Sequence, residues 1–453
     1  MTGRGQELSE GPPTVTRNVM PHHRTTVTQV TEPADQRSPK NFPQAEGFRV
    51  SGAVYERILR RTDAGITRSD VAKHDESVES ALSITDRAER AWLRSATRPP
   101  RASGRILRTV DLFSGCGGLT IGLDEAARAL GRSFEPALAV DLDPNATATY
   151  AHNFPDAQTV TASVTEVFDG SIRAALTTGE RLIAKRHKEV DILVGGPPCQ
   201  GHSDLNNRTR RNDAKNALYA SMVRAAEVLG PAHVLIENVP GALHDKNGVV
   251  QRTADQLDEA GYHVTLDVVD LPLLGVPQTR KRLILAASRN GALDFESMRR
   301  NHARSPRDVR WAMEDLQDSP STTTSRMFET ARSNPDTRRR MRFLFERDLY
   351  DLPDSERPPC HASGGHTYSS IYGRLRWDRP SQTITRGFYS MCMGRYVHPS
   401  RERTLTAREA ARLQYIPDWF QFPETTNRTA LATMIGNAVP SRLSTAIALE
   451  WLR

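Results

Sequence analysis

The feature that most constrains this chain is a series of short apolar runs that alternate with helical segments between residues 106 and 287. Alternating strands and helices are typical of a sheet of parallel strands that helices cover on both faces. Ligands of such sheets bind outside the carboxyl ends of the strands. We therefore expect an α/β fold with functional residues just after the apolar runs. The runs cover 106–113, 137–140, 190–194, 233–236 and 283–287.

The segments on either side of this alternation differ from it in composition. Residues 1–45 are rich in Thr, Pro, Gln and charged side chains, and we expect them to be disordered. In residues 46–104, apolar side chains recur at helical spacing before an Arg/Pro/Ser-rich linker, which predicts two or three short helices. Residues 288–371, dominated by charge, Pro and Ser, are expected to form a small domain or a long insertion. Regular structure resumes in 372–453, which leaves 105–287 as the central domain.

Composition excludes several other classes of protein. No apolar run approaches the roughly 20 residues of a membrane-spanning helix. The N-terminus lacks the apolar core of a secretory signal, so we expect a cytoplasmic protein. The four cysteines are too scattered for a disulfide framework or a zinc site. Cys360, His361 and His366 supply too few ligands for a closed site, so no metal is expected.

The chain carries an excess of basic residues, with 61 Lys and Arg against 54 Asp and Glu and a net charge of +7. This excess is compatible with a polyanionic partner but does not require one. Basic side chains crowd residues 299–310 and 338–347, with Trp311, Phe343 and Phe345 in or beside them. Such segments can follow the phosphates of a nucleic acid. A solvated basic face explains the charge equally well.

A glycine-rich turn follows the first apolar run, from Asp111 to Gly118, with the sequence Asp-Leu-Phe-Ser-Gly-Cys-Gly-Gly. Glycines let a backbone approach a ligand closely, and the helix after them offers free N–H groups. No Gly-Lys-Ser/Thr follows, so this is not a phosphate loop of the Walker type. Asp141, which closes the second run, is placed to accept hydrogen bonds from ribose hydroxyls. Tight turns need glycine in any case, and a strand-end Asp often caps a helix.

A rigid loop with a cysteine follows the third apolar run, in the sequence Gly-Gly-Pro-Pro-Cys-Gln-Gly from Gly195 to Gly201. The prolines and glycines present Cys199 at a strand end, near free backbone amides. Such surroundings lower a thiol pKa and favour nucleophilic use. An isolated cysteine is more often inert and buried, but the constrained loop favours a functional one.

Charged side chains mark the ends of two further runs. Glu237 follows 233–236, where partial burial can keep a carboxyl group protonated and able to donate a hydrogen bond. Gln278, Arg280 and Arg282 fall on one face of a strand, and two guanidinium groups there can hold a base carbonyl or a phosphate. The alternatives are a strand-end Glu that faces water and a solvated basic strand end.

Taken together and in this order, these motifs resemble the cytosine carbon-5 methyltransferase family. Two further segments, 403–414 and Gly436 to Pro440, look like the last two signature blocks of that family. The resemblance covers about residues 109–453, interrupted after residue 288. It implies a Rossmann-like sheet of an S-adenosylmethionine-dependent methyltransferase, with helices on both faces. Residues 288–371 then take the place of a smaller target-recognition domain.

The resemblance implies S-adenosylmethionine as the cofactor, bound on the glycine-rich turn. Phe113 matches the residue that packs on adenine, Asp141 the ribose ligand, and Leu142 the apolar cover of the ring. Ser163 stands where the family usually has an Asp, so weaker binding is expected. Asn437 returns to the same site from the C-terminal part. The full set of matching contacts is Phe113, Gly115, Gly117, Asp141, Leu142, Ser163 and Asn437.

The resemblance also assigns the chemistry to four residues. The Cys199 thiolate would add to carbon 6 of cytosine, and Glu237 would hydrogen-bond to the ring nitrogen and the amine. Arg280 and Arg282 would hold the base carbonyl and the surroundings of the thiol. Because carbon 5 is unreachable inside double-stranded DNA, the base must be flipped out. Residues 202–211 look like the mobile loop that closes over it.

A bacterial enzyme of this kind usually belongs to a restriction-modification or related defence system, and we expect a monomer. The N-terminal extension is a candidate for contact with a partner from such a system. The alternatives are a tRNA cytosine-5 methyltransferase, a catalytically idle DNA-binding relative, and a nicotinamide-dependent oxidoreductase. The short recognition region and Cys-Phe-Thr element of the tRNA branch are not found. The four catalytic residues argue against an idle relative, and the Pro-Pro-Cys-Gln loop has no place in hydride transfer.

Overall fold

The computed structural model of the protein describes residues 45–62, 65–73, 82–198, 218–245, 248–318, 325–362 and 370–453. The predicted disordered segment 1–45, apart from its last residue, and the predicted mobile loop 202–211 lie outside these ranges. Among the described helices, none is long and apolar enough to cross a membrane.

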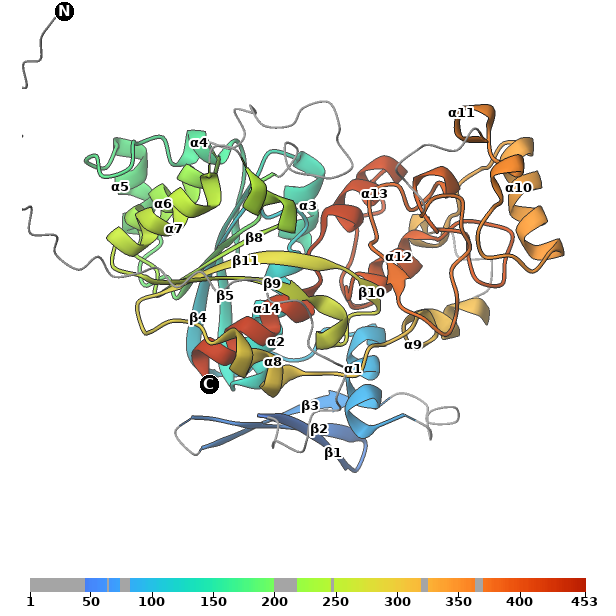
Figure 1. The fold of residues 1–453 in the computed structure, drawn as a ribbon. Coiled ribbons are helices and arrows are strands. Elements are labelled where there is room, and N and C mark those ends of the chain that lie inside the picture. The colour runs from blue at the N-terminus through green and yellow to red at the C-terminus, as the bar shows by residue number, and fades with distance from the viewer. Residues whose placement is uncertain are drawn as a thin grey trace, which may run out of the picture.

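A seven-stranded sheet forms the centre of the molecule, in the order β6-β5-β4-β7-β8-β11-β9 (Figure 1). Its strands are β4 (Gly104–Leu112), β5 (Arg132–Asp141), β6 (Gln158–Thr161), β7 (Ile192–Gly195), β8 (His233–Asn238), β9 (His263–Asp270) and β11 (Lys281–Ser288). From β6 to β8 every neighbouring pair is parallel. The α/β prediction is confirmed.

Strand β11 departs from the predicted parallel arrangement, because it runs antiparallel to both β8 and β9. Only the 3-10 helix η3 (Leu271–Leu274) and the short strand β10 (Gln278–Thr279) separate β9 from β11. A parallel connection needs a crossover of a dozen or more residues, usually a helix. The chain between these strands is too short for that, so it turns back on itself.

Helices cover the sheet on both faces, as predicted. One layer contains α4 (Val164–Val167), α5 (Thr178–Arg186), α6 (Leu218–Leu229) and α7 (Val249–Glu259) (Figure 1). The other contains α2 (Gly118–Ala129), α3 (Pro144–Asn153), α8 (Phe295–His302) and α14 (Ser441–Leu452). Side chains alternate along β8, so this strand contributes to the core under each layer of helices. Val234 and Ile236 face the first core, and Leu235 faces the second.

The N-terminal segment contains an antiparallel sheet of β1 (Glu46–Ser51), β2 (Val54–Arg60) and β3 (Ile66–Ala72), followed by helix α1 (Ile84–Arg94). The prediction of two or three short helices between residues 46 and 104 is therefore wrong, except for α1. Strand β2 buries Tyr55, Arg57 and Leu59 at every second position. Arg57 occupies a buried position of this strand but is a polar residue. The alternation of apolar and polar residues that marks a strand is therefore not visible in the sequence.

A small separate hydrophobic cluster lies in the second half of the chain. Its buried members are Met341, Leu344, Leu352, Ile371, Tyr372, Met391 and Val397. Helix α8 and α9 (Val309–Met313) instead pack in the main core. The small cluster thus begins later than residue 288 and continues beyond residue 371. The division of the chain into domains stays a prediction.

The remaining elements of this half are short. They are η4 (Glu314–Asp318), η5 (Arg326–Phe328), α10 (Pro335–Glu346), η6 (Asp354–Glu356), α11 (Pro359–Ala362), β12 (Ser381–Gln382), η7 (Met391–Met393), α12 (Ala407–Leu413) and α13 (Arg428–Asn437). Strand β12 pairs in parallel with β10 and so returns the chain to the central domain. Helix α12 lies within the motif segment 403–414, and α14 follows the motif from Gly436 to Pro440.

Candidate active site

The glycine-rich turn joins β4 to α2 in a left-handed backbone conformation. Phe113, Gly115 and Gly117 have φ of 56°, 52° and 100°. At Gly117 an added Cβ would lie 3.1 Å from the rings of Tyr150 and Phe154, so a side chain is excluded by space as well as by φ. At Gly115 an added Cβ would meet nothing within 4 Å. The backbone at Gly115 is therefore open to a ligand.

Asp141 fixes this turn from the end of the neighbouring strand β5. Its Oδ2 accepts a hydrogen bond from the backbone N–H of Gly115 at 2.8 Å, and its Oδ1 accepts from the N–H of Asp143 at 2.9 Å. Hydrogen bonds to a carboxylate are stronger than neutral ones. Asp141 thus holds the turn in shape and places a negative charge beside it.

Two further predicted cofactor residues lie around the same strand ends. Leu142 follows Asp141 and is 70% exposed, so its side chain is free to contact a ligand at this strand end. Ser163 follows β6, whose Thr161 pairs with Asp141. The Ser163 hydroxyl caps α4 by accepting from the N–H of Thr165 at 3.3 Å. This capping bond competes with any ligand for the serine oxygen.

Asn437, the last residue of α13, comes to this site from near the C-terminus, as predicted. An added Cβ at Gly118 would lie 2.7 Å from the carbonyl oxygen of Val439. The segment just after Asn437 therefore rests directly on the start of α2. The Asn437 side chain is exposed. The exposed Leu142 and Asn437 side chains, the open backbone at Gly115 and the Asp141 carboxylate are the predicted cofactor contacts that the structure places around the glycine-rich turn.

Cys116 lies in the same turn but is not a candidate nucleophile. Burial raises the pKa of its thiol to about 12, so the sulfur stays protonated near neutral pH. Its Sγ lies 3.9 Å from the carbonyl oxygen of Met434. Cys116 is a packing residue that joins α2 to α13.

Cys199 lies outside the described residues, but the loop that leads to it is described as far as Pro198. The side-chain amide of Asn238 donates to the carbonyl oxygen of Pro197 at 2.9 Å and so ties the loop to β8. An added Cβ at Gly195 would lie 2.6 Å from the Met222 sulfur, so glycine is required where β7 ends. The chain entering Cys199 is thus held on two sides.

Glu237 and Arg282, which the sequence assigned to one site, form an ion pair beside this loop. Arg282 Nε lies 2.5 Å from Glu237 Oε1, and the side chains are 11% and 10% exposed. The second carboxylate oxygen, Oε2, lies 3.1 Å from the Cβ position of Gly196. The arginine therefore holds one carboxylate oxygen, while the other points to the loop that precedes Cys199.

Arg280 is buried on the same strand region but contacts a different part of the chain. Its Nη1 donates to the carbonyl oxygen of Ile384 at 3.0 Å. Its own carbonyl oxygen accepts from the N–H of Leu271. Of the two predicted arginines, Arg282 reaches Glu237 and Arg280 anchors the segment that returns from the small cluster.

Two glutamines that sequence reasoning left without a role connect these parts. Gln278 is fully buried, and its Nε2 donates to Gln414 Oε1 at 2.7 Å. The Nε2 of Gln414 donates in turn to the carbonyl oxygens of Ile435 at 2.6 Å and Ala438 at 3.2 Å. The amides thus join the arginine-bearing strand to the turn that carries Asn437. The sequence offered one signal for each residue: a glutamine inside a motif, at a position where a buried side chain is expected.

The two basic segments noted in the sequence have different environments. Arg338, Arg339 and Arg342 on α10 are exposed. Arg304 and Arg307, in contrast, are buried in ion pairs with acidic side chains. The hypothesis of a phosphate-tracking or solvated face is therefore wrong for Arg304 and Arg307. It stays open for the exposed Arg300 and Arg310 of the first segment and for the second segment. Within the described part of the chain, no three His, Cys, Asp or Glu side chains are grouped to hold a metal ion.

Comparison with known proteins agrees with this geometry. The family model for C-5 cytosine-specific DNA methylases matches residues 107–453. The type II methyltransferase M1.BsuMI of Bacillus subtilis is 39% identical over 411 residues, covering 90% of this chain and 95% of that protein. The type II methyltransferase M1.HphI of Haemophilus parahaemolyticus is 30% identical over 349 residues, covering 76% and 86%.

A solved structure shows the same fold. The prophage-encoded DNA modification methyltransferase of E. coli superposes with a TM-score of 0.52 at 23% identity, covering 76% of this chain and 98% of that one. At this identity the likeness concerns the fold alone. It confirms the predicted methyltransferase sheet with helices on both faces.

Proposed function

The chain belongs to the C-5 cytosine-specific DNA methylase family, and from this membership we infer that it methylates carbon 5 of cytosine in DNA. The observation that carries the conclusion is the family match over residues 107–453, which includes every strand end of the candidate site. The relatives from Bacillus and Haemophilus are type II methyltransferases. A role in a restriction-modification system follows by analogy, and such a role places the protein with chromosomal DNA in the cytoplasm.

We propose Cys199 as the nucleophile. Its thiolate adds to carbon 6 of the base, which makes carbon 5 nucleophilic enough to accept a methyl group. A water molecule then takes the proton from carbon 5, and the electron pair of that C–H bond restores the ring double bond and expels the thiolate. The Asn238–Pro197 hydrogen bond fixes the approach of this loop, because it ties the residue two positions before the nucleophile to β8.

Glu237 stabilises the charge that develops on the base. Because Arg282 holds Oε1, Oε2 in its protonated form would donate to ring nitrogen 3, which takes up the negative charge when the thiolate adds. The exocyclic amine of cytosine would donate to the same carboxyl group. Arg282 therefore orients the carboxyl group that contacts the base. Arg280, fixed to Ile384, places its guanidinium at the junction between the active site and the returning segment.

S-adenosylmethionine supplies the methyl group when bound. We assign its adenosine to Phe113, Asp141 and Leu142, with Ser163 and Asn437 at the edges of the site. The open backbone at Gly115 and the exposed Leu142 support this assignment. Ser163 is already engaged in capping α4, so it is a weaker partner for the adenine amine than an aspartate would be.

The substrate is proposed to be double-stranded DNA with the target base flipped out of the stack. The exposed arginines on α10 can neutralise phosphates at the edge of such a complex. Phosphate contacts position the protein without reading the sequence, so the target sequence must be read by other side chains.

A transfer assay with two substrates tests this function. The protein is incubated with S-adenosylmethionine labelled in the methyl group and with either unmethylated genomic DNA or total tRNA. Label should enter 5-methylcytosine in the DNA and be absent from the tRNA, and a Cys199→Ala variant should transfer none. Label in tRNA alone would overturn the assignment of DNA as the substrate.

A further inference from the structure

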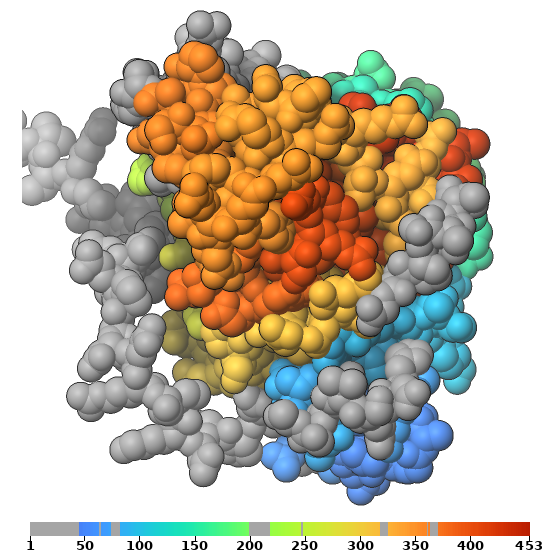
Figure 2. Space-filling view, turned by 90° about the vertical axis from the view of Figure 1, so that its right-hand side faces the viewer, coloured from blue at the N-terminus to red at the C-terminus, as the bar shows by residue number. Residues whose placement is uncertain are grey.

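The N-terminal module, which comprises β1, β2, β3 and α1, lies outside the segment that the family model matches. It nevertheless packs closely on the rest of the protein. We call the described residues 325–362, which include α10, the recognition region. Figure 2 shows the blue module at one end, this orange region at the other, and the yellow residues around 300 between them. What the module does is not explained by the methyl transfer itself.

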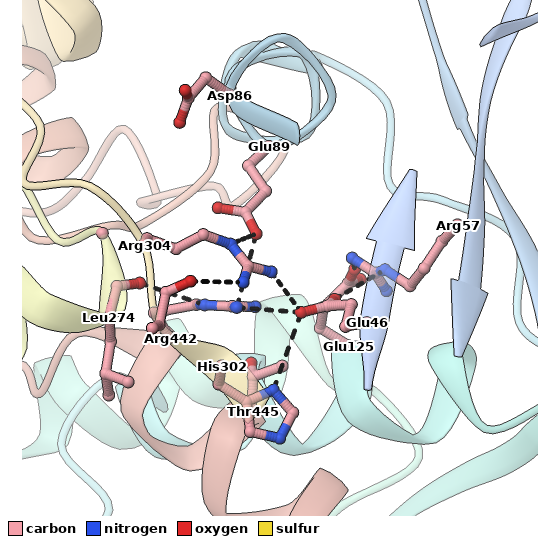
Figure 3. A network of polar contacts seen from close by, with 12 residues as sticks. Glu46, Arg57, Asp86, Glu89, Glu125, Leu274, His302, Arg304, Arg442 and Thr445 are labelled. Atoms are coloured by element: carbon pink, nitrogen blue, oxygen red, sulfur yellow. Dashed lines mark hydrogen bonds and ion pairs between the residues drawn. The ribbon is translucent and has the colours of Figure 1, made fainter. Parts of the chain in front are cut away.

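Two buried acids of the module meet arginines from the other end of the chain (Figure 3). Glu46 Oε2 lies 2.5 Å from Arg304 Nη2 and 3.0 Å from Arg442 Nη2. Glu89 Oε1 lies 2.9 Å from Arg304 Nε, and its Oε2 accepts from Arg307. Each of these three arginine side chains is only 3% exposed.

Acids of the module and arginines of the body pair at the centre of this interface. The module contributes Glu46, Glu89 and the partly exposed Asp86, and the body contributes the three arginines. In the opposite sense, Arg57 of the module pairs with Glu125 of the body. Burial alone would raise the pKa of Glu89, but Arg304 and Arg307 hold it well below its usual value. Glu89 therefore stays ionised near neutral pH. Without the acids of the module, guanidinium groups would be left buried and unpaired, which is strongly unfavourable.

Arg304 and Arg307 lie at the neck of the recognition region. We define the neck as residues 303–310 and 377–379. The outgoing and returning chains are hydrogen-bonded there, since the N–H of Val309 donates to Arg379 and the N–H of Arg310 donates to Trp377. The acids of the module thus hold the neck where the chain enters and leaves the recognition region.

Helix α1 extends this contact along the neck. The Trp311 indole N–H donates to the carbonyl oxygen of Asp86 at 3.2 Å, and Arg94 pairs with Asp315 at 2.8 Å. The Tyr415 ring stacks on both Trp92 and Trp311, with centroids 5.7 and 6.0 Å apart. The module therefore joins the neck to the segment that follows α12.

The Glu46 carboxylate also contacts the part of the protein that carries the glycine-rich turn. Arg442, the second partner of Glu46, lies on α14, and α14 packs along α2, the helix that starts at the glycine-rich turn. An added Cβ at Gly122 of α2 would lie 2.0 Å from the Ser441 carbonyl oxygen, so these helices are in direct backbone contact. Glu46 thus bridges the neck and the framework of the cofactor site.

We propose that Glu46 and Glu89 are positioning residues that set the angle at which the recognition region presents DNA to the active site. The proposal rests on the proposed function. When one acid is lost, the buried arginines regain a favourable environment most easily if the neck shifts towards water. Although Glu46 also reaches α14, the cofactor turn itself is held by Asp141 and by the Gln278–Gln414 pair. The effect should therefore fall on DNA and spare S-adenosylmethionine.

The test compares full-length variants in steady-state methylation and in binding of S-adenosylmethionine by calorimetry. Glu89→Gln should raise the KM for DNA about tenfold, with the Kd for S-adenosylmethionine unchanged within about twofold. Glu56→Gln is the matched control, because Glu56 lies in the same module and pairs with Arg49 and Arg68 on its outer face. It should leave both quantities unchanged.

A second variant covers the case in which Glu89→Gln does not fold. Arg94→Gln removes the pair with Asp315 at the partly exposed rim of the same contact, where folding should survive. It should raise the KM for DNA without raising the Kd for S-adenosylmethionine. An unchanged KM for DNA in a folded variant, or a parallel loss of both affinities, would overturn the proposal. If the unaltered protein does not methylate DNA, the proposed function fails instead, which the same assay shows separately.

Discussion

Nε of Arg282 lies 2.5 Å from Oε1 of Glu237, across the antiparallel pair of strands β11 and β8. The two residues lie 45 positions apart in the sequence, and the reversal of β11 brings them together at the strand end. One charged pair thus links the strand that carries the carboxyl group to the strand that carries Arg282.

Replacing Arg282 should damage the chemical step. In Arg282→Gln the carboxyl group of Glu237 loses the partner that orients it, so kcat should fall about 100-fold with a smaller change in the KM for DNA. Initial rates at saturating DNA measure this. Lys281→Gln is a suitable control, because Lys281 is exposed and lies 3.7 Å from Asp270 in a surface pair. A kcat close to the unaltered value would contradict the assigned role.

Replacing Asp141 should weaken cofactor binding. Asp141→Asn removes the charge that accepts from the Gly115 N–H, and the glycine-rich turn then loses its fixed geometry. We expect the Kd for S-adenosylmethionine to rise about tenfold, a loss typical of one charge-assisted hydrogen bond. Calorimetry measures it, with Asp156→Asn as control in an exposed pair with Arg101. Equal affinities for both variants would place the cofactor elsewhere.

The buried glutamine pair should matter for stability and for the cofactor together. Gln414→Ala leaves the carbonyl oxygens of Ile435 and Ala438 without this donor, which should lower the free energy of unfolding by about 1–3 kcal/mol. Urea unfolding measures that change. The Kd for S-adenosylmethionine should rise as well, because the turn with Asn437 loosens. Gln421→Ala, at an exposed side chain, should change neither quantity.

The sequence predicted the residues at the strand ends well, for a physical reason. Parallel strands end at one edge of a sheet, so motifs that follow apolar runs must meet there. Asp141, the glycine-rich turn and Glu237 were found in this way. The direction of β11 was missed, since an apolar run looks the same in either direction.

Long-range charge pairing was the main part that the sequence could not reveal. Arg304 and Arg307 read as solvated or phosphate-binding residues because their acidic partners lie more than 200 positions away in the sequence. Arg57 hid the alternation of β2 for the same reason. Polar side chains are expected at the surface unless a partner is known, and here the partners come from other elements.

Stability at acidic pH offers a test of one such pair. Two hydrogen bonds from Arg224, the larger cause, and two backbone N–H groups lower the pKa of Glu180 to about 2. A carboxyl group with a lowered pKa stabilises the fold above its unfolded pKa near 4.5, and this contribution is lost as pH falls towards 2.

Glu180→Gln should therefore be less stable than the unaltered protein by on the order of 3 kcal/mol at pH 7. The difference should shrink between pH 4.5 and 2, as urea unfolding at several pH values would show. Glu189→Gln, at a 90% exposed side chain, should show no such pH-dependent difference. A gap for Glu180→Gln that stays constant with pH would contradict the assigned ion pair.

The central claim is that this chain methylates cytosine in DNA with Cys199 as the nucleophile. The most direct measurement is bisulfite sequencing of genomic DNA from a host that lacks cytosine carbon-5 methylation and expresses either the protein or its Cys199→Ala variant. Cytosines should be protected within one recurring sequence in the first case and converted throughout in the second. Protection that persists in the variant would contradict the role of Cys199. Complete conversion in both, with soluble protein that binds S-adenosylmethionine, would contradict the assignment of DNA as substrate.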